Sequence, residues 1–188
     1  MNPWRRKGTI VVGDIDRHEA AVLRGLVSQI DEILRARAAE APTDELAELT
    51  GIRTGPSTPP EDPILARLLP DFHRLDDDAP NAKDVDSAGA LRSLHEPELL
   101  DLKTGVAGVV LRTCPEHGGR IRLTLEHGEA WLAALNDVRL ALGTALDVTE
   151  EMPDELPPDD PRAPHLGVYH WLTWMQESLI HALAGDDL

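Results

Sequence analysis

The sequence predicts an α+β fold that is mainly α, with four to six helices packed on a small two-stranded β ribbon. Two observations favour this class. A short strand followed by an N-capped amphipathic helix begins near residue 8, and the same pattern returns near residue 118. The chain has 188 residues, of which 41% are apolar, which is enough for one domain with a buried core. We therefore expect a single domain over residues 1–188.

The first strand–turn–helix unit is expected over residues 8–39. The segment 9–13, Thr-Ile-Val-Val-Gly, is typical of a short strand. Asp16 and Glu19 then have the spacing of a capping box, which begins a helix. This helix should end near Ala39. Its apolar residues recur at helical period, at Leu23, Leu26, Val27, Ile30, Ile33 and Leu34.

The middle of the chain gives weaker signals. Residues 53–62 are rich in proline and are expected to form a connection, while 63–70 fit one or two helical turns. Leu91 and Leu94 indicate a helix that ends before Pro97. Pro97 then suits the first turn of another helix. The apolar side of that second helix would hold Leu99, Leu102, Val106 and Val109.

The second strand–turn–helix unit is expected over residues 118–147. Within it, residues 120–125 alternate as a half-buried strand, and the helix that follows carries Trp131. Residues 153–164 form a second proline-rich connection, and the last helix covers 166–184. The apolar stripe of this last helix consists of Val168, Leu172, Met175, Leu179 and Ala182.

The two predicted strands are expected to pair with each other. A two-stranded ribbon is marginally stable in water by itself, so helices must cover one of its faces. We therefore predict that residues 9–13 and 120–125 lie in one small sheet, with the helices that follow them packed side by side.

The net charge of −16 is unevenly distributed. Residues 1–37 carry seven Arg or Lys against five Asp or Glu, whereas residues 126–188 carry two against thirteen. DNA is a dense polyanion that most of this surface would repel, so we expect DNA contacts to be weak or indirect and to collapse with salt. An acidic surface suits a basic protein partner, although solubility alone explains it equally well.

Cys114 is the one cysteine of the chain. It lies three residues before His117, so its thiol pKa could be lowered, or the two residues could contribute to a metal site. A loop thiol near a helix end is the simpler interpretation. No disulfide can form within these residues, so a redox role would need a sulfenic acid or a disulfide to another molecule.

His170, Glu177 and His181 fall on one side of the last helix, and the last two have the spacing of metal ligands. A polar helix face is the more common reason for such a pattern. The sequence has no glycine-rich phosphate loop, serine nucleophile elbow or His-Glu-x-x-His motif. We therefore expect no enzyme activity, no cofactor and no metal site, and we keep a metal-dependent enzyme as the alternative.

Aromatic side chains gather in the last third of the chain. Tyr169, Trp171 and Trp174 join Trp131 to supply four of the six Phe, Trp and Tyr residues. Core packing is the ordinary role of such residues. An anchor for a protein partner is the alternative, since Trp and Tyr are favoured at binding hot spots.

The helix that follows residue 130 has a polar strip beside its core stripe. The core stripe consists of Trp131, Leu135, Val138 and Leu142. The polar strip and its neighbours are Asn136, Asp137, Arg139, Gly143 and Thr144. Gly143 would admit a close neighbour. These residues could bind a partner directly, but we favour an internal bracket that holds the last helix around Tyr169 and Trp171. The resulting partner surface would include Tyr169, His170, Trp171 and Trp174.

Two stretches near the end of the chain are specific, AWLAALNDVRLALGTALDVTEE and YHWLTWMQESL, and two earlier ones are DPILARLLPD and GTIVVGDIDRHEAAVLRGL. Together, over residues 8–184, they resemble an actinobacterial family of long-uncharacterised proteins that includes the oxidative-stress transcriptional regulator AosR. The resemblance implies a redox-sensitive regulator that works through an alternative sigma factor, with no catalytic residues. It also implies sensing by a disulfide within the chain, and this sequence departs there because Cys114 is alone.

These features predict a regulator that acts by protein–protein interaction, with an alternative sigma factor or another transcription component as the partner. No apolar run approaches the roughly 18 residues of a membrane span, and no apolar signal region follows the basic N-terminus. We therefore expect a cytoplasmic location. A structural adaptor linked to proteolysis is a further alternative, and the oligomeric state stays open, with a homodimer as one option.

Overall fold

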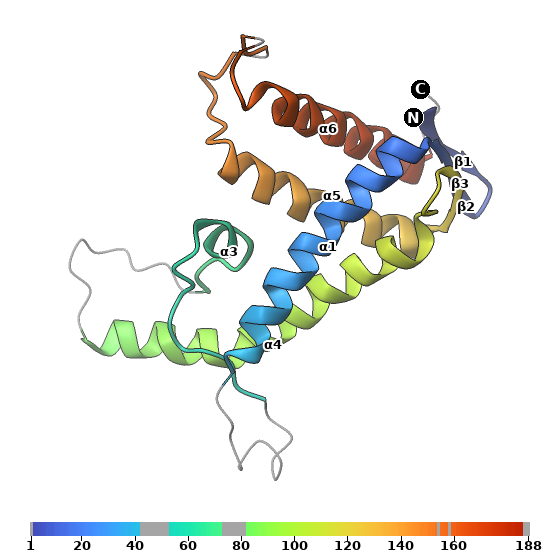
Figure 1. The fold of residues 1–188 in the computed structure, drawn as a ribbon. Helices are drawn as coiled ribbons and strands as arrows, with labels where there is room; N and C mark the ends of the chain where they lie inside the picture. The colour runs from blue at the N-terminus through green and yellow to red at the C-terminus, as the bar shows by residue number, and fades with distance from the viewer. Residues whose placement is uncertain (1, 42–52, 73–81, 154, 158, 186–188) are drawn as a thin grey trace.

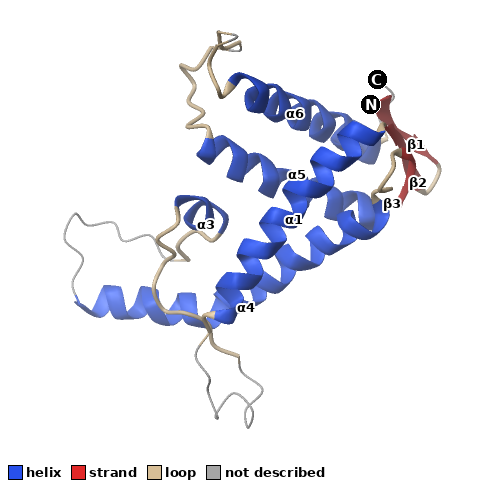
Figure 2. Ribbon diagram, in the orientation of Figure 1, coloured by secondary structure: helices blue, strands red, loops and turns tan. Residues whose placement is uncertain are grey.

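The computed structural model describes residues 2–41, 53–72, 82–153, 155–157 and 159–185 (Figure 1). Within these residues the chain forms five helices and three strands, which confirms the mainly helical α+β class (Figure 2). In chain order the elements are β1 (Asn2–Lys7), β2 (Ile10–Ile15), α1 (Arg17–Ala39), α3 (Pro63–Leu68), α4 (Ala82–Thr113), β3 (Gly119–Thr124), α5 (Leu125–Ala145) and α6 (Ala163–Ala184).

The sheet has three antiparallel strands in the order β1-β2-β3, so the prediction of two strands was wrong by one. The predicted pairing of β2 with β3 is confirmed, with Val11 opposite Leu123. The sequence pattern does not predict strand β1, because Trp4 is the one apolar residue of this strand that faces the core. The next inward position is Arg6, whose guanidinium donates to the carbonyl oxygen of Leu183 at 2.8 Å.

Trp4 attaches β1 to the rest of the fold. Its ring lies edge-on to the ring of Trp131, with 5.4 Å between the ring centroids. The ring also lies against Gly13 of β2, where an added Cβ would come within 2.8 Å of it. Only glycine fits beneath the indole at this position. Trp131, which has no exposed surface, donates its indole N–H to the Thr113 hydroxyl at 2.7 Å and so joins α5 to the end of α4.

Helix α1 begins and ends where the sequence predicts. The carboxylate of Asp16 accepts the backbone N–H of Glu19 at 2.9 Å, and the carboxylate of Glu19 accepts the backbone N–H of Asp16 at 2.8 Å. This reciprocal pair is a capping box, which satisfies two donors that a helix start leaves open. The helix then continues to Ala39.

Helix α4 continues through Pro97, so the prediction of two helices separated before this proline was wrong. A proline inside a helix lacks the N–H that would bond to the carbonyl four residues earlier. Here that carbonyl belongs to Ser93, and the backbone N–H of Gly55 donates to it at 2.7 Å. The Ser93 hydroxyl in turn donates to the carbonyl of Gly55 at 2.8 Å. The connection before α3 therefore supplies the bond that Pro97 removes.

The helices lie on one side of the sheet and enclose the core (Figure 1). Helix α5 is central, since it contacts α1, α3, α4 and α6. Helix α1 packs chiefly along α4, and its contact with α5 is smaller, so the helices that follow the paired strands touch without being principal neighbours. Core residues with no more than 1% exposure include Leu23, Leu34, Ile121, Leu123, Leu135, Leu172, Met175 and Leu179.

An Arg–Glu–Arg cluster is buried where α1 meets α4. Glu96, which is fully buried, accepts a hydrogen bond from Arg37 Nε at 2.7 Å and another from Arg92 Nη1 at 2.6 Å. Arg37 also donates to the carbonyl of Thr58, and Arg92 to the carboxylate of Asp71. The cluster therefore connects the segments before and after α3 to helices α1 and α4.

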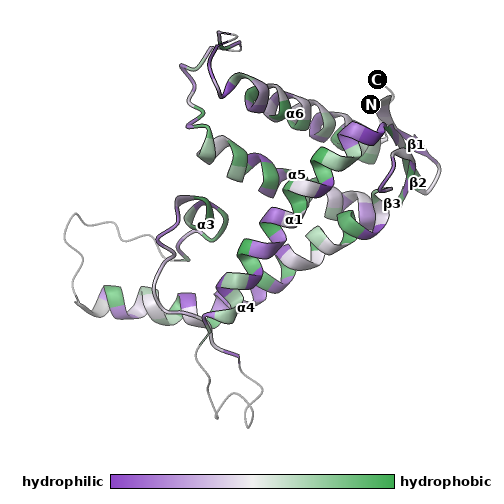
Figure 3. Ribbon diagram, viewed as in Figure 1, coloured by the Kyte–Doolittle hydropathy of each residue, from purple (hydrophilic) through white to green (hydrophobic). Residues whose placement is uncertain are grey.

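The outer side of α4 is less buried than the sequence predicts. Leu102, which we expected on the apolar side of a helix, is 64% exposed. Leu91 and Leu94 are also exposed, and Figure 3 shows apolar positions along this helix. None of the helices among the described residues is long and apolar enough to cross a membrane.

Candidate functional site

Arg139 of α5 connects this helix to α6. Its Nε donates to the Thr173 hydroxyl at 3.1 Å, and its Nη1 donates to the side-chain oxygen of Gln176. The guanidinium also lies over the Tyr169 ring, 5.5 Å from the centroid, in a cation–π contact. Three residues of α6 on successive turns thus contact one side chain of α5. This is the arrangement of an internal bracket.

Gly143 lies one turn further along α5 and faces the same aromatic ring. A Cβ at this position would come within 3.3 Å of the Tyr169 ring. The neighbour that approaches Gly143 is therefore the Tyr169 side chain and not the backbone of another helix. The hydroxyl of Thr144 donates to the carbonyl of Leu140, within its own helix. These residues line a cleft of about 350 Å³, together with Arg67, Arg139, Leu140, Asp147, Val148 and Tyr169.

Neither of the other two polar residues of this strip has a hydrogen bond to α6 among the described residues. Asp137 is buried on the α4 side of α5, where it accepts a hydrogen bond from Lys103 Nζ at 2.5 Å. Burial raises the pKa of Asp137, and the ion pair with Lys103 opposes that shift. Asn136 is half-buried, and its side chain has no hydrogen bond within the described part of the chain. The polar strip of α5 therefore contributes to two helix interfaces, with α6 through Arg139 and with α4 through Asp137.

The outer face of α6 presents a stripe of exposed side chains. His170, Trp174, Glu177 and His181 follow one another at helical spacing and are all exposed. Trp174 is 39% exposed, so it is not a core residue as a tryptophan ordinarily is. Trp171 is half-buried against the core, and its indole N–H has no partner within the residues described. The stripe is called the α6 outer face below.

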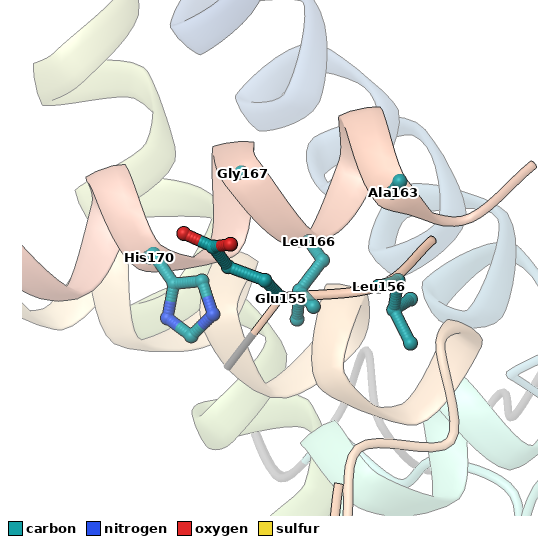
Figure 4. Close-up of a pocket in the computed structure, with 6 residues that line it drawn as sticks. All are labelled: Glu155, Leu156, Ala163, Leu166, Gly167 and His170. Carbon is teal, nitrogen blue, oxygen red and sulfur yellow. The ribbon is translucent and has the colours of Figure 1, made fainter. Parts of the chain in front are cut away.

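A hollow of about 460 Å³ adjoins the N-terminal end of this face. Figure 4 shows its lining, in which His170 and Leu166 of α6 lie beside Glu155 and Leu156 of the preceding connection. The His170 ring also lies edge-on to the Tyr169 ring, with 5.9 Å between their centroids. The described residues contain no group of three His, Cys, Asp or Glu side chains that could hold a metal ion.

Cys114 follows the last residue of α4 and is 3% exposed. Burial raises the pKa of its thiol to about 11, and the charge of Arg24 offsets part of this shift. Arg24 Nη1 donates to the backbone carbonyl of Cys114 at 2.8 Å, which fixes the turn. The idea that His117 lowers the thiol pKa is therefore wrong, since His117 is exposed and the thiol lies inside the fold.

We expect Cys114 to react slowly with hydrogen peroxide while the chain is folded. A thiol pKa of about 11 in place of 9.0 lowers the thiolate fraction about a hundredfold at neutral pH. Intact-mass measurement after peroxide treatment checks this, with the urea-unfolded chain as the fast-reacting control. Modification of the folded chain as fast as that of the unfolded chain would contradict it.

The positions of these residues could be predicted only in part. Thr173 and Gln176, the partners of Arg139, gave no signal beyond their polar character in an apolar helix. Lys103 was missed as the partner of Asp137, because the two residues lie on different helices. Such pairings depend on how α4, α5 and α6 pack, which local periodicity does not determine.

Comparison with known proteins gives the family of this chain. Residues 1–183 match the family model "Domain of unknown function (DUF2017)". The chain is 49% identical over 174 residues to the "Oxidative stress regulator AosR" of Mycobacterium tuberculosis, which covers 90% of this chain and 80% of the relative. It is 47% identical over 171 residues to the "Putative oxidative stress regulator AosR" of Mycobacterium leprae, covering 88% and 79%. No solved structure matches significantly. The chain belongs to the DUF2017 family, an AosR-like family of actinobacteria whose mycobacterial members are named as regulators of oxidative stress.

Proposed function

We propose that this chain regulates the response to oxidative stress by binding a protein through the α6 outer face. The names of its mycobacterial relatives support the regulatory role. The partner that we propose is a component of the transcription machinery, with an alternative sigma factor as the expected class. In this proposal the chain has no enzyme activity of its own and works in the cytoplasm.

Trp174 is the observation that carries the proposal. Trp174 leaves 39% of its surface in contact with water on a well-formed helix, which is unfavourable for a large apolar side chain. Tryptophan residues are enriched at the centres of protein interfaces. Exposed Ile180 lies on the same helix and adds apolar surface. His170 and Glu177, one turn away on either side, supply the polar rim that such interfaces have.

The Arg139 bracket supports the same proposal by fixing the helix beneath this face. Because Arg139 contacts Tyr169, Thr173 and Gln176, α6 is held against rotation about its axis. A rigid helix loses little entropy on binding, which favours affinity. The polar strip of α5 thereby acts on a partner indirectly, through the orientation of α6.

Substitution Trp174→Ala is expected to weaken partner capture by about tenfold or more, the usual effect of removing a hot-spot aromatic residue. The measurement is a quantitative pull-down from lysate with purified chain as bait. Thermal melting should show that the fold is intact, because Trp174 does not belong to the core cluster. Leu102→Ala is the matched control, since it removes an even more exposed apolar side chain from α4. Equal capture by all three proteins would contradict the proposal.

A further inference from the structure

The three strands bring residues from both halves of the chain onto one face of the sheet. Directly paired residues project to the same side, and the side alternates along each strand. Arg5, Val12 and Arg122 therefore form one row, and Lys7, Ile10 and Thr124 form the next. The helices cover the opposite side, as Figure 2 shows. The side that bears these two rows is called the outer sheet face.

The outer sheet face is basic in a chain whose net charge is −16. Arg5, Lys7 and Arg122 are all exposed, and none of them has an ion pair or hydrogen bond within the residues that the structure describes. Arg120 also lies on this face, but it is paired with Asp14 at 3.0 Å. Three uncompensated cations thus occupy one small surface.

Most other arginines of the described chain are already engaged. Arg37 and Arg92 are held by Glu96 inside the fold, and Arg139 is held by α6. Arg24 and Arg6 donate to backbone carbonyls. Arg67 and Arg112 are also exposed and without ion pairs in the described residues, but the outer sheet face brings three such cations onto one small surface.

The middle of the outer sheet face is apolar. Val12, which is only 8% exposed, lies between Arg5 and Arg122, which are about 10 Å apart because two strand spacings separate them. Ile10, half-buried, lies beside Lys7 in the next row. An apolar centre with charged positions around it is the usual composition of a protein interface.

We propose that the outer sheet face binds an acidic segment of a protein, in which carboxylates flank an apolar side chain. Arginine forks bind carboxylates through paired hydrogen bonds, and the apolar side chain would lie on half-buried Ile10, since Val12 is already covered. The proposal shares with the proposed function only the assumption that the partner is a protein. It concerns a surface separate from the α6 outer face.

The charge balance favours an acidic protein segment over nucleic acid. A DNA duplex carries one negative charge for about every 1.7 Å of its length. Three cations would neutralise few of those charges, and the remainder would face a chain of net charge −16. A segment with two or three carboxylates is matched in number by Arg5, Lys7 and Arg122, and brings little excess charge.

The test is fluorescence anisotropy at low salt with a short labelled peptide in which glutamate and valine alternate. We expect this peptide to bind the full chain, and the same peptide with glutamine in place of glutamate to bind much less. The double substitution Arg5→Gln/Arg122→Gln should weaken binding by about tenfold or more, and added salt should weaken it as well.

Arg67→Gln/Arg112→Gln is the matched control, because it removes two exposed cations without ion pairs in the described residues outside the sheet. It should leave peptide binding unchanged, as should Trp174→Ala, which separates this proposal from the α6 outer face. Absence of binding by the glutamate peptide would overturn the proposal. Equal losses in the control, or tighter binding of a short DNA duplex that Arg5→Gln/Arg122→Gln abolishes, would also overturn it.

Discussion

Substitution Glu96→Gln is expected to lower the free energy of unfolding by about 3–5 kcal/mol, the usual cost of removing one member of a buried ion cluster. Glu96 is the one carboxylate between the buried guanidinium groups of Arg37 and Arg92. Glutamine keeps the size of the side chain but removes its charge, so two cations would be left close together inside the fold. Urea unfolding followed by circular dichroism measures the effect.

The control for this experiment is Arg53→Gln, which breaks an ion pair with Asp101 in which both side chains are exposed. Water screens that pair, so the unfolding midpoint should change little. A midpoint shift for Glu96→Gln no larger than that of Arg53→Gln would show that the cluster does not depend on the Glu96 charge.

Substitution Trp131→Ala is expected to lower the free energy of unfolding by about 3–5 kcal/mol, the range found when large aromatic residues are removed from cores. Trp131 has no exposed surface, and it contacts Trp4 of β1 and Thr113 of α4. Its loss leaves a cavity where three elements meet, and it also leaves the Thr113 hydroxyl without this donor. Thermal and urea unfolding both measure the change.

Trp174→Ala is the control for this experiment, since it removes the same type of side chain from an exposed position of α6. That variant should unfold close to the parent protein. Trp131→Phe should lie between the parent and Trp131→Ala, because a smaller ring fills part of the cavity. Similar unfolding midpoints for Trp131→Ala and Trp174→Ala would show that Trp131 is not a main contributor to the stability of the core.

Local patterns were sufficient to predict the elements whose signals lie within a few residues. The capping box of Asp16 and Glu19, and the alternation that ends at Thr124, both depend on near neighbours in sequence. Their helix and strand are found where predicted. The pairing of β2 with β3 also follows from simple physics, because a lone strand cannot satisfy its backbone groups.

Features that depend on distant partners could not be predicted in this way. Pro97 is normally a helix breaker, and only the N–H of Gly55, far away in sequence, makes it acceptable inside α4. Glu96 carries no mark in the sequence that sets it apart from the surface glutamates around it. Its burial depends on Arg37 and Arg92 meeting it from two sides.

The candidate site was predictable as a region but not as a surface. Polar residues inside an apolar helix need partners, which is why the sequence points to Arg139, and its side chain donates to Thr173 of α6. Which aromatic residue would be exposed was not evident, because α6 has apolar residues around much of its circumference. Packing against the core covers much of Trp171 and leaves Trp174 outside.

The attachment of β1 to α6 has a consequence for how the protein is made. The backbone N–H of Trp4 donates to the Ser178 hydroxyl across 174 positions of sequence. A chain emerging from the ribosome can pair β1 with β2 at once, yet the Trp4 ring must wait for Trp131 of α5, and its backbone N–H must wait for Ser178 of α6. Contacts between such distant residues form late and slowly. Strand β1 and helix α6 therefore close this part of the core together, after translation of α6.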